Sequence, residues 1–116
     1  MRDSILAYGA LAALLLPAMA VQGAGDDAIA EGLEIATDRN RGNCYSCHMA
    51  PGAEMAGNSG PPLIQMRMRY PDREVLKAQI ADPRVRNPQT VMPPYGAHGI
   101  LTDRELERVV DYLLTI

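Results

Sequence analysis

Phenylalanine and tryptophan are absent from this sequence, and five tyrosines are its only aromatic side chains. The absence matters because a chain of 116 residues has little apolar surface to bury. Large aromatic side chains normally supply much of the bulk of a core. The length leaves room for one domain and no second core. We therefore expect something other than an amino-acid side chain to fill the middle of the fold.

Long apolar runs are absent as well. The N-terminal run at residues 10–16 is far shorter than the roughly 20 apolar residues that a membrane anchor needs. It follows Arg2 and precedes a proline and the small-residue site AMA that ends at Ala20, which is the order of an export signal. We predict that residues 1–20 are a signal peptide cleaved after Ala20 and that residues 21–116 form a periplasmic domain with no stable membrane anchor. An uncleaved N-terminal anchor is the alternative.

An excess of basic charge is also lacking, because 11 Lys and Arg residues face 14 Asp and Glu residues, for a net charge of −3. This balance gives no indication of nucleic-acid binding. The basic side chains gather between Arg67 and Arg86, whereas both ends of the chain are acidic. We interpret the basic segment as a solvated surface, with a docking patch as the alternative.

No segment alternates between apolar and polar residues as a strand would, so the expected fold is all-α. The first helix is predicted to have Asp26 or Asp27 as its cap and to end near Asn40. A glycine on its apolar face costs about 1 kcal/mol relative to alanine, which makes sense if another helix crosses closely there. The residues expected on that face are Ile29, Gly32, Leu33 and Ala36.

The C-terminal helix is the most clearly marked element. Thr102 and Glu105 are the two ends of a capping box, and Leu101 is placed to pack as a hydrophobic staple on Leu106. Apolar residues then recur at helical spacing, so one stripe is expected to be buried: Leu106, Val109, Val110, Leu113 and Leu114.

Two shorter helices and two loops are predicted between these ends. A helix over residues 63–69 stops at Tyr70, which precedes a proline. Another begins after Asp72 and ends at Asp82, with a buried face formed by Val75, Leu76, Gln79 and Ile80. Residues 49–62 and 83–99 are rich in glycine or proline and are predicted to be loops. Loops of this length usually carry function.

Both cysteines and one of only two histidines lie within the seven residues GNCYSCH. C-x-x-C-H is the attachment signature of c-type haem, in which the thiols of Cys44 and Cys47 add to two vinyl groups of the porphyrin and His48 offers its imidazole to the iron. We predict one covalently bound haem c. Such a group also accounts for the missing aromatic bulk.

Other uses of the two cysteines fit the sequence less well. A thioredoxin-like dithiol follows a buried strand, and none is predicted. A disulfide between the two would close too short a loop to restrain the unfolded chain much. A zinc site needs a fourth ligand, and only His98 is left over.

Met92 is the predicted second axial ligand of the iron. It precedes Pro93 and Pro94, which limit the movement of this loop, and methionine pairs with histidine in haem electron carriers. Ligation by His98 and an open position are the alternatives. The other methionines that follow the predicted signal peptide are interpreted as packing residues: Met49, Met55, Met66 and Met68.

His48, as an iron ligand, is expected to donate its second ring N–H to an acceptor. The rigid G-P-P-L turn that begins at Gly60 offers a proline carbonyl for this purpose, and we favour Pro61 over Pro62. Such a hydrogen bond would hold the imidazole in one tautomer.

The order of these features resembles class I cytochromes c over essentially the whole mature chain. The strings GNCYSCH, PGAEMAGNSGPPL, RYPDREVLKAQI, NPQTVMPPYGAHGILT and VVDYLLT further resemble the SoxX family, the small monohaem subunits of periplasmic thiosulfate-oxidising cytochrome complexes. The resemblance implies helices and long loops wrapped around one haem. Cys44 and Cys47 would attach the haem, and His48 and Met92 would bind its iron.

The same resemblance implies a function. SoxX proteins pair with a larger cytochrome subunit, SoxA, which holds the substrate site. The complex acts as an L-cysteine S-thiosulfotransferase: it couples thiosulfate oxidatively to a cysteine of the carrier protein SoxYZ. The small subunit receives the released electrons and passes them to a downstream acceptor, so no residue of this chain is expected to be catalytic. A freestanding periplasmic electron shuttle and a ligand-binding haem sensor are the alternatives.

Overall fold

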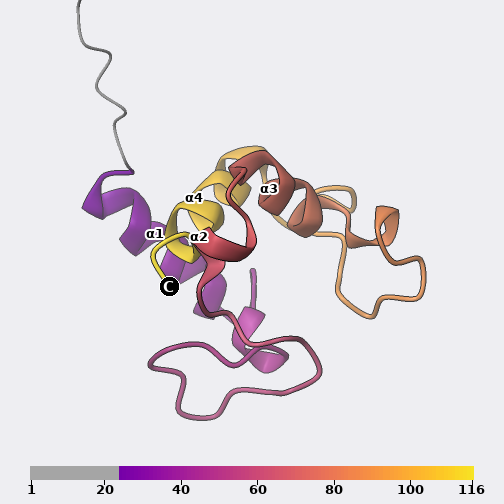
Figure 1. Ribbon diagram of the computed structural model, residues 1–116, viewed down its shortest axis with the longest axis horizontal. Coiled ribbons are helices and arrows are strands. Elements are labelled where there is room, and N and C mark those ends of the chain that lie inside the picture. Colours follow the sequence, from indigo (N-terminus) through magenta and orange to yellow (C-terminus); the bar gives the residue numbers. More distant parts are fainter. Residues whose placement is uncertain (1–23) are drawn as a thin grey trace, which may run out of the picture.

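The computed structural model describes residues 24–116, so the signal peptide predicted over residues 1–20 lies outside the described part. Helices and short 3₁₀ turns make up all the regular structure of this part (Figure 1), which contains no strand. The all-α class predicted from the sequence is confirmed. The elements are α1 Asp26–Thr37, η1 Cys44–Ser46, α2 Met66–Arg69, α3 Arg73–Ala81, η2 Pro83–Val85 and α4 Asp103–Leu113. Between residues 24 and 116, no helix has the length and apolar character needed to cross a membrane.

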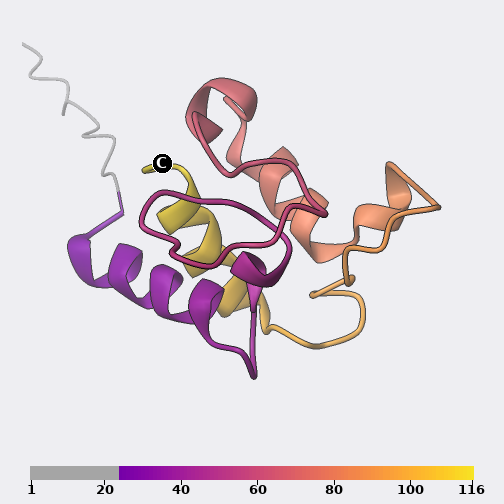
Figure 2. The ribbon, with the colours of Figure 1, turned by 90° about the horizontal axis from the view of Figure 1, so that it is seen from below.

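Helices α1 and α4 pack against each other and make the most extensive contact between elements of the fold (Figure 2). Gly32 lies at their crossing, where a Cβ atom would stand 1.9 Å from the backbone oxygen of Arg108 and 2.8 Å from the Cβ atom of Tyr112. No larger residue fits between the two helices without displacing one of them. The close crossing predicted from this glycine is confirmed.

The ends of α1 differ from the prediction. Gly25 is the N-cap and makes no side-chain hydrogen bond to the helix, whereas Asp26 and Asp27 lie in the first turn. Carboxylates are favourable there because the N-terminal end of a helix carries a partial positive charge. The helix ends at Thr37 rather than near Asn40.

The buried face of α1 is also shifted from the prediction. Gly32, Ile35 and Ala36 are buried, but Leu33 is 41% exposed. The contact with α4 decides which stripe faces inward, and Ile35 lies three residues after Gly32 on that stripe. Leu33 follows Gly32 directly and therefore points about a quarter turn away, so its predicted burial is wrong.

Helix α4 has the predicted cap and stripe. The Thr102 hydroxyl accepts from the N–H of Glu105, and the Glu105 carboxylate accepts from the N–H of Thr102, which completes the capping box. Every apolar residue of the predicted stripe is buried except Leu114, which is half-buried. Asp111 is buried beside them and accepts hydrogen bonds from Arg73 at 3.0 Å and Arg108 at 3.1 Å. This pairing offsets the cost of removing a carboxylate from water.

Helix α2 is shorter than the helix predicted over residues 63–69. Gln65, immediately before it, has a φ of 52°, a left-handed conformation through which an α-helix does not continue. The end of α2 agrees with the prediction, because Tyr70 is the C-cap and its N–H donates to the carbonyl of Met66.

Helix α3 begins after Asp72 as predicted, and the Asp72 carboxylate accepts from the N–H of Glu74 at 2.9 Å. Leu76 and Ile80 face the core, whereas Val75 is 43% exposed, contrary to the prediction. A short helix that packs on one side has room for a narrow apolar stripe only.

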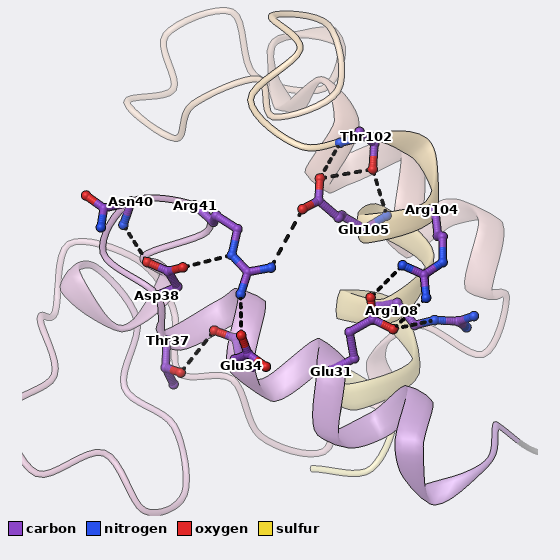
Figure 3. A network of polar contacts seen from close by, with 10 residues as sticks. All are labelled: Glu31, Glu34, Thr37, Asp38, Asn40, Arg41, Thr102, Arg104, Glu105 and Arg108. Carbon is purple, nitrogen blue, oxygen red and sulfur yellow. Dashed lines mark hydrogen bonds and ion pairs between the residues drawn. The ribbon is translucent and has the colours of Figure 1, made fainter.

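Ion pairs on the surface also connect α1 to α4 (Figure 3). Glu31 accepts hydrogen bonds from Arg104 at 2.7 Å and from Arg108 at 3.2 Å. Exposed pairs of this kind contribute at most about 1 kcal/mol each, so the apolar contact between the helices supplies most of the stability here. A further cation, Arg41, faces three carboxylates at the end of α1 and the start of α4: Glu34, Asp38 and Glu105.

Two long connections leave the helical frame, which we define as α1, α3 and α4. The first cavity loop, residues 42–65, contains η1 and leads to α2, and the second cavity loop, residues 87–102, leads to α4. In Figure 1 the first loop extends below the helices and the second extends to the right. Isolated hydrogen bonds hold them, such as the 2.7 Å bond from the N–H of Leu63 to the carbonyl of Met49.

Candidate functional site

A cavity of about 450 Å³ is enclosed by the two cavity loops together with α2, α3 and α4. Its size lies in the range of small-molecule and cofactor sites, about 300–1,000 Å³. Much of its wall is apolar, with buried side chains from α3 and α4 such as Leu76, Ile80, Val109 and Leu113. All four residues predicted to hold a haem line the cavity: Cys44, Cys47, His48 and Met92.

The C-x-x-C-H motif forms a tight turn at one side of this cavity. The N–H groups of Cys47 and His48 both donate to the carbonyl of Cys44, at 3.2 and 2.9 Å. Asn43, just before the turn, has a left-handed φ of 47°, which asparagine adopts more readily than most residues. The turn therefore brings three chemically active side chains to one space within five residues.

The two cysteine thiols lie in different surroundings. Burial raises the pKa of the Cys44 thiol to about 11, whereas hydrogen bonds from the hydroxyls of Ser59 and Ser46 lower the pKa of the Cys47 thiol. The two sulfurs are not joined to each other. Residues 24–116 hold no cluster of three or more His, Cys, Asp or Glu side chains that suits a metal ion.

The ring of His48 lies against Gly60 and Pro61 of the first cavity loop. Its Nδ1 lies 2.7 Å from the carbonyl oxygen of Pro61, and a Cβ atom on Gly60 would stand 2.3 Å from Cε1 of the ring. A carbonyl oxygen can only accept, so Nδ1 carries the proton of this bond. The tautomer leaves Nε2 with a free lone pair, the state in which an imidazole binds a metal.

Met92 is half-buried and lines the cavity from the second loop. Its N–H donates to the Thr90 hydroxyl at 3.1 Å. His98, the alternative ligand, is exposed and is not among the residues that line the cavity within the described chain. Its Nε2 lies 3.4 Å from a guanidinium nitrogen of Arg84 instead.

Sequence reasoning missed two further residues of the cavity wall. Met66 is 3% exposed and also lines the cavity, with its sulfur 3.5 Å from a guanidinium nitrogen of Arg69. Tyr95 lines it from the second loop, and burial raises the pKa of its hydroxyl to about 12, so this group stays a donor at neutral pH. The lack of phenylalanine and tryptophan was the signal for Tyr95, because it makes every tyrosine a candidate core residue.

The residues of the cavity fit a c-type haem. Two thiols suit two thioether bonds, an imidazole with a fixed tautomer and a thioether suit the two axial positions of iron, and apolar walls suit a porphyrin. These side chains come from both cavity loops, so a single bound haem would contact both loops.

The family model described as cytochrome C oxidase, cbb3-type, subunit III matches residues 27–113. An uncharacterized lipoprotein of Aquifex aeolicus (strain VF5) is 35% identical over 74 residues, which are 63% of this chain and 36% of that protein. The chain thus spans about a third of the length of this curated relative. One chain in the crystal structure of SoxXA from P. pantotrophus superposes with a TM-score of 0.66 at 28% identity, over 74% of this chain and 79% of that one.

Proposed function

The chain belongs to the family described as cytochrome C oxidase, cbb3-type, subunit III, and we propose that it is the small electron-transfer subunit of a SoxXA-type cytochrome complex. It has an all-α cytochrome c fold and is similar to SoxX. The observation that carries the proposal is the single cavity lined by both cysteines, His48 and Met92.

Each of these residues has a role in the proposal. Cys44 and Cys47 would attach one haem c through thioether bonds, and His48 and Met92 would take the two axial positions of its iron. Such a haem supplies a one-electron couple when bound, and a methionine ligand raises its potential. Pro61 orients His48 by accepting from Nδ1. If His48 and Met92 both bound the iron, no position would be left for a substrate, so this chain would carry electrons and perform no sulfur chemistry.

The proposed partner is a SoxA-type cytochrome subunit that holds the substrate site. Electrons would reach this chain when the complex couples thiosulfate to a cysteine of a SoxYZ carrier, the reaction of an L-cysteine S-thiosulfotransferase, and would then pass to a downstream acceptor. The surface of the cavity loops supports a lasting partner. It carries a single charged residue, Glu54, and exposes Met55 at 96% and Val91 at 83%. Stable interfaces are depleted in charge and enriched in methionine at their centre.

Export to the periplasm is part of the proposal. Residues 1–20 would be removed as a signal peptide, and residues 21–116 would form the mature monohaem domain. Covalent attachment of c-type haem takes place outside the cytoplasm, which agrees with this order. The relative described as a lipoprotein also supports export.

A freestanding electron shuttle to a terminal oxidase is the second candidate. The family description names a subunit of an oxidase, the class of enzyme to which such a shuttle would deliver electrons. The two candidates share the haem site and differ in whether a partner stays bound.

Purification from the native periplasm tests both the lasting partner and the covalently bound haem. A subunit is expected to elute well above the size of a single chain and together with a second cytochrome, whereas a shuttle elutes alone. The mass of the mature chain is expected to include one haem. Colourless protein with an unmodified polypeptide mass, purified from cells that have haem attachment machinery, would contradict the haem site itself.

A further inference from the structure

Tyr95 connects the two cavity loops. Its hydroxyl donates to the carbonyl oxygen of Gly42 at 2.5 Å, and both residues are buried. Among residues 24–116, this is the only hydrogen bond between the first and the second cavity loop. Gly42 lies two residues before Cys44, and Tyr95 lies three residues after Met92. The bond therefore joins the segments that carry the two proposed iron ligands.

Other contacts hold both ends of this bond. The N–H of Gly42 donates to the carbonyl of Ile35 in α1 at 3.0 Å, and a Cβ atom on Gly42 would stand 2.6 Å from the same oxygen. On the other side, the N–H of Gly96 donates to the carbonyl of Ala81 in α3 at 3.0 Å. The hydrogen bond between Tyr95 and Gly42 thus connects two segments, each of which is bonded to a helix of the helical frame.

Met92 itself is held less firmly. The hydrogen bond of its N–H to Thr90 stays within the second cavity loop. Neither Met92 nor Pro93 forms a hydrogen bond to another element in the part of the chain described. The first residue after Met92 that is bonded to another segment is Tyr95, at most about 11 Å away along the chain.

We propose that the Tyr95 hydroxyl is a positioning group for Met92, which holds the second cavity loop against the C-x-x-C-H turn and so resists displacement of the methionine by an external ligand. This inference rests on the proposed function, because it takes Met92 as an iron ligand. Without the hydroxyl, the Gly42 carbonyl would be buried with no donor while the loop is closed. When the second cavity loop is open, water can donate to that carbonyl instead. Loss of the Tyr95 hydroxyl therefore destabilises the closed loop more than the open loop.

Tyr95→Phe tests the proposal, because it removes the hydroxyl and keeps the ring. The ferric protein is titrated with imidazole, and loss of the near-infrared sulfur-to-iron absorption band follows the displacement of Met92. The apparent affinity for imidazole is expected to rise about tenfold, which corresponds to about 1.4 kcal/mol.

Tyr112→Phe is the matched control. The Tyr112 residue is also buried, and its hydroxyl bonds the hydroxyl of Tyr45 in the C-x-x-C-H turn. This bond connects the turn to α4 rather than to the second cavity loop. Both variants are expected to unfold at a lower temperature than the wild type. Only Tyr95→Phe is expected to change the affinity for imidazole.

Three results would overturn the inference in different ways. Unchanged imidazole affinity in Tyr95→Phe contradicts it, and so does an equal rise in Tyr112→Phe, because the hydroxyl would then act through general stability. If the Tyr95→Phe variant does not form a folded protein with haem, NMR of tyrosine-labelled wild-type protein tests the proposal instead. The Tyr95 hydroxyl proton is expected to exchange with water faster in the imidazole-bound form, and equal rates refute the proposal. Failure of the proposed iron ligation is distinct, since the wild type itself would then lack the near-infrared band, and failure of the proposed partnership would instead show as elution of the chain alone.

Discussion

The helical frame and the cavity loops are stabilised in different ways. In the frame, α1 and α4 bury apolar stripes against each other, and the surface is dense with ion pairs. The cavity loops contain no regular element besides η1, and Glu54 is the only Asp, Glu, Lys or Arg residue in them. Prolines and isolated hydrogen bonds hold these loops around a cavity of about 450 Å³.

This difference indicates how the two regions depend on a bound group. Helices α1 and α4 contact each other directly, so their packing needs nothing else at the crossing. The loops face each other across the cavity and share a single hydrogen bond within the described chain, that of Tyr95 to Gly42. A group that fills the cavity would contact both loops, because both line it. Four experiments test this difference between the helical frame and the cavity loops.

Removal of both attachment points is expected to have the largest effect. In Cys44→Ala/Cys47→Ala the cavity has no covalently held group. At about 24 cal/mol per Å³, a void of 450 Å³ costs on the order of 10 kcal/mol, which is comparable with the whole stability of a domain. The variant is expected to lose its cooperative thermal transition, measured by circular dichroism. Ser46→Ala, in the same turn, is the control. A cooperative transition in the double variant would show that the frame folds without the haem.

Gly32→Ala is expected to affect the frame alone. The added Cβ atom would stand 1.9 Å from the Arg108 backbone oxygen, so α1 and α4 must move apart at a cost of about 3 kcal/mol. The free energy of unfolding in denaturant measures the loss, while the near-infrared band is expected to stay. Gly25→Ala is the control, because nothing lies within 4 Å of the position of its Cβ atom. Equal stabilities for the two variants would refute the crossing geometry.

Met92→Ala is expected to affect the function of the loops more than the stability of the fold. The near-infrared band should disappear, and the reduction potential should fall within the roughly 0.8 V range that axial ligands cover, because a thioether favours the reduced iron. Met66→Ala, which also borders the cavity, is the control and should keep the band. A band that survives in Met92→Ala and disappears in Met66→Ala would assign the ligand to Met66 instead.

The pH dependence of stability is expected to be the smallest effect and to come from the frame. A hydrogen bond from Lys77 lowers the pKa of the Glu107 carboxyl, with a further contribution from Arg73. A carboxyl whose pKa is lower in the folded state stabilises the fold above its unfolded pKa, near 4.3, and this contribution is lost as the pH falls through the folded pKa. The free energy of unfolding should therefore decrease below about pH 5.

Glu107→Gln should reduce this decrease by at most about 1 kcal/mol, since the ion pairs are partly exposed. Glu54→Gln, in a loop, is the control, because Glu54 has no ion-pair partner within residues 24–116. Chemical denaturation at several pH values measures both variants. An equal change in the two variants would remove the distinction between frame and loops.

Sequence patterns predicted the elements best where the information is local. The capping box of Thr102 and Glu105, the N-cap at Asp72 and the close approach at Gly32 depend on a few neighbouring residues or on the absence of a side chain, and all three are present. The prediction that Leu33 and Val75 are buried was wrong, because each lies at the edge of an apolar stripe. The packing partner, rather than the helix itself, decides which edge of a stripe is covered.

The candidate site shows the same division. Residue types at fixed short spacing were enough to identify the C-x-x-C-H motif, the methionine and proline candidates and the helical class. The three-dimensional packing of the chain was needed to show that Met66 borders the same cavity as Met92, that His98 lies away from it, and that Tyr95 bonds Gly42. Tyr95 and Gly42 are 53 residues apart in the chain, and no local pattern encodes a contact whose geometry depends on how α1, α3 and α4 pack.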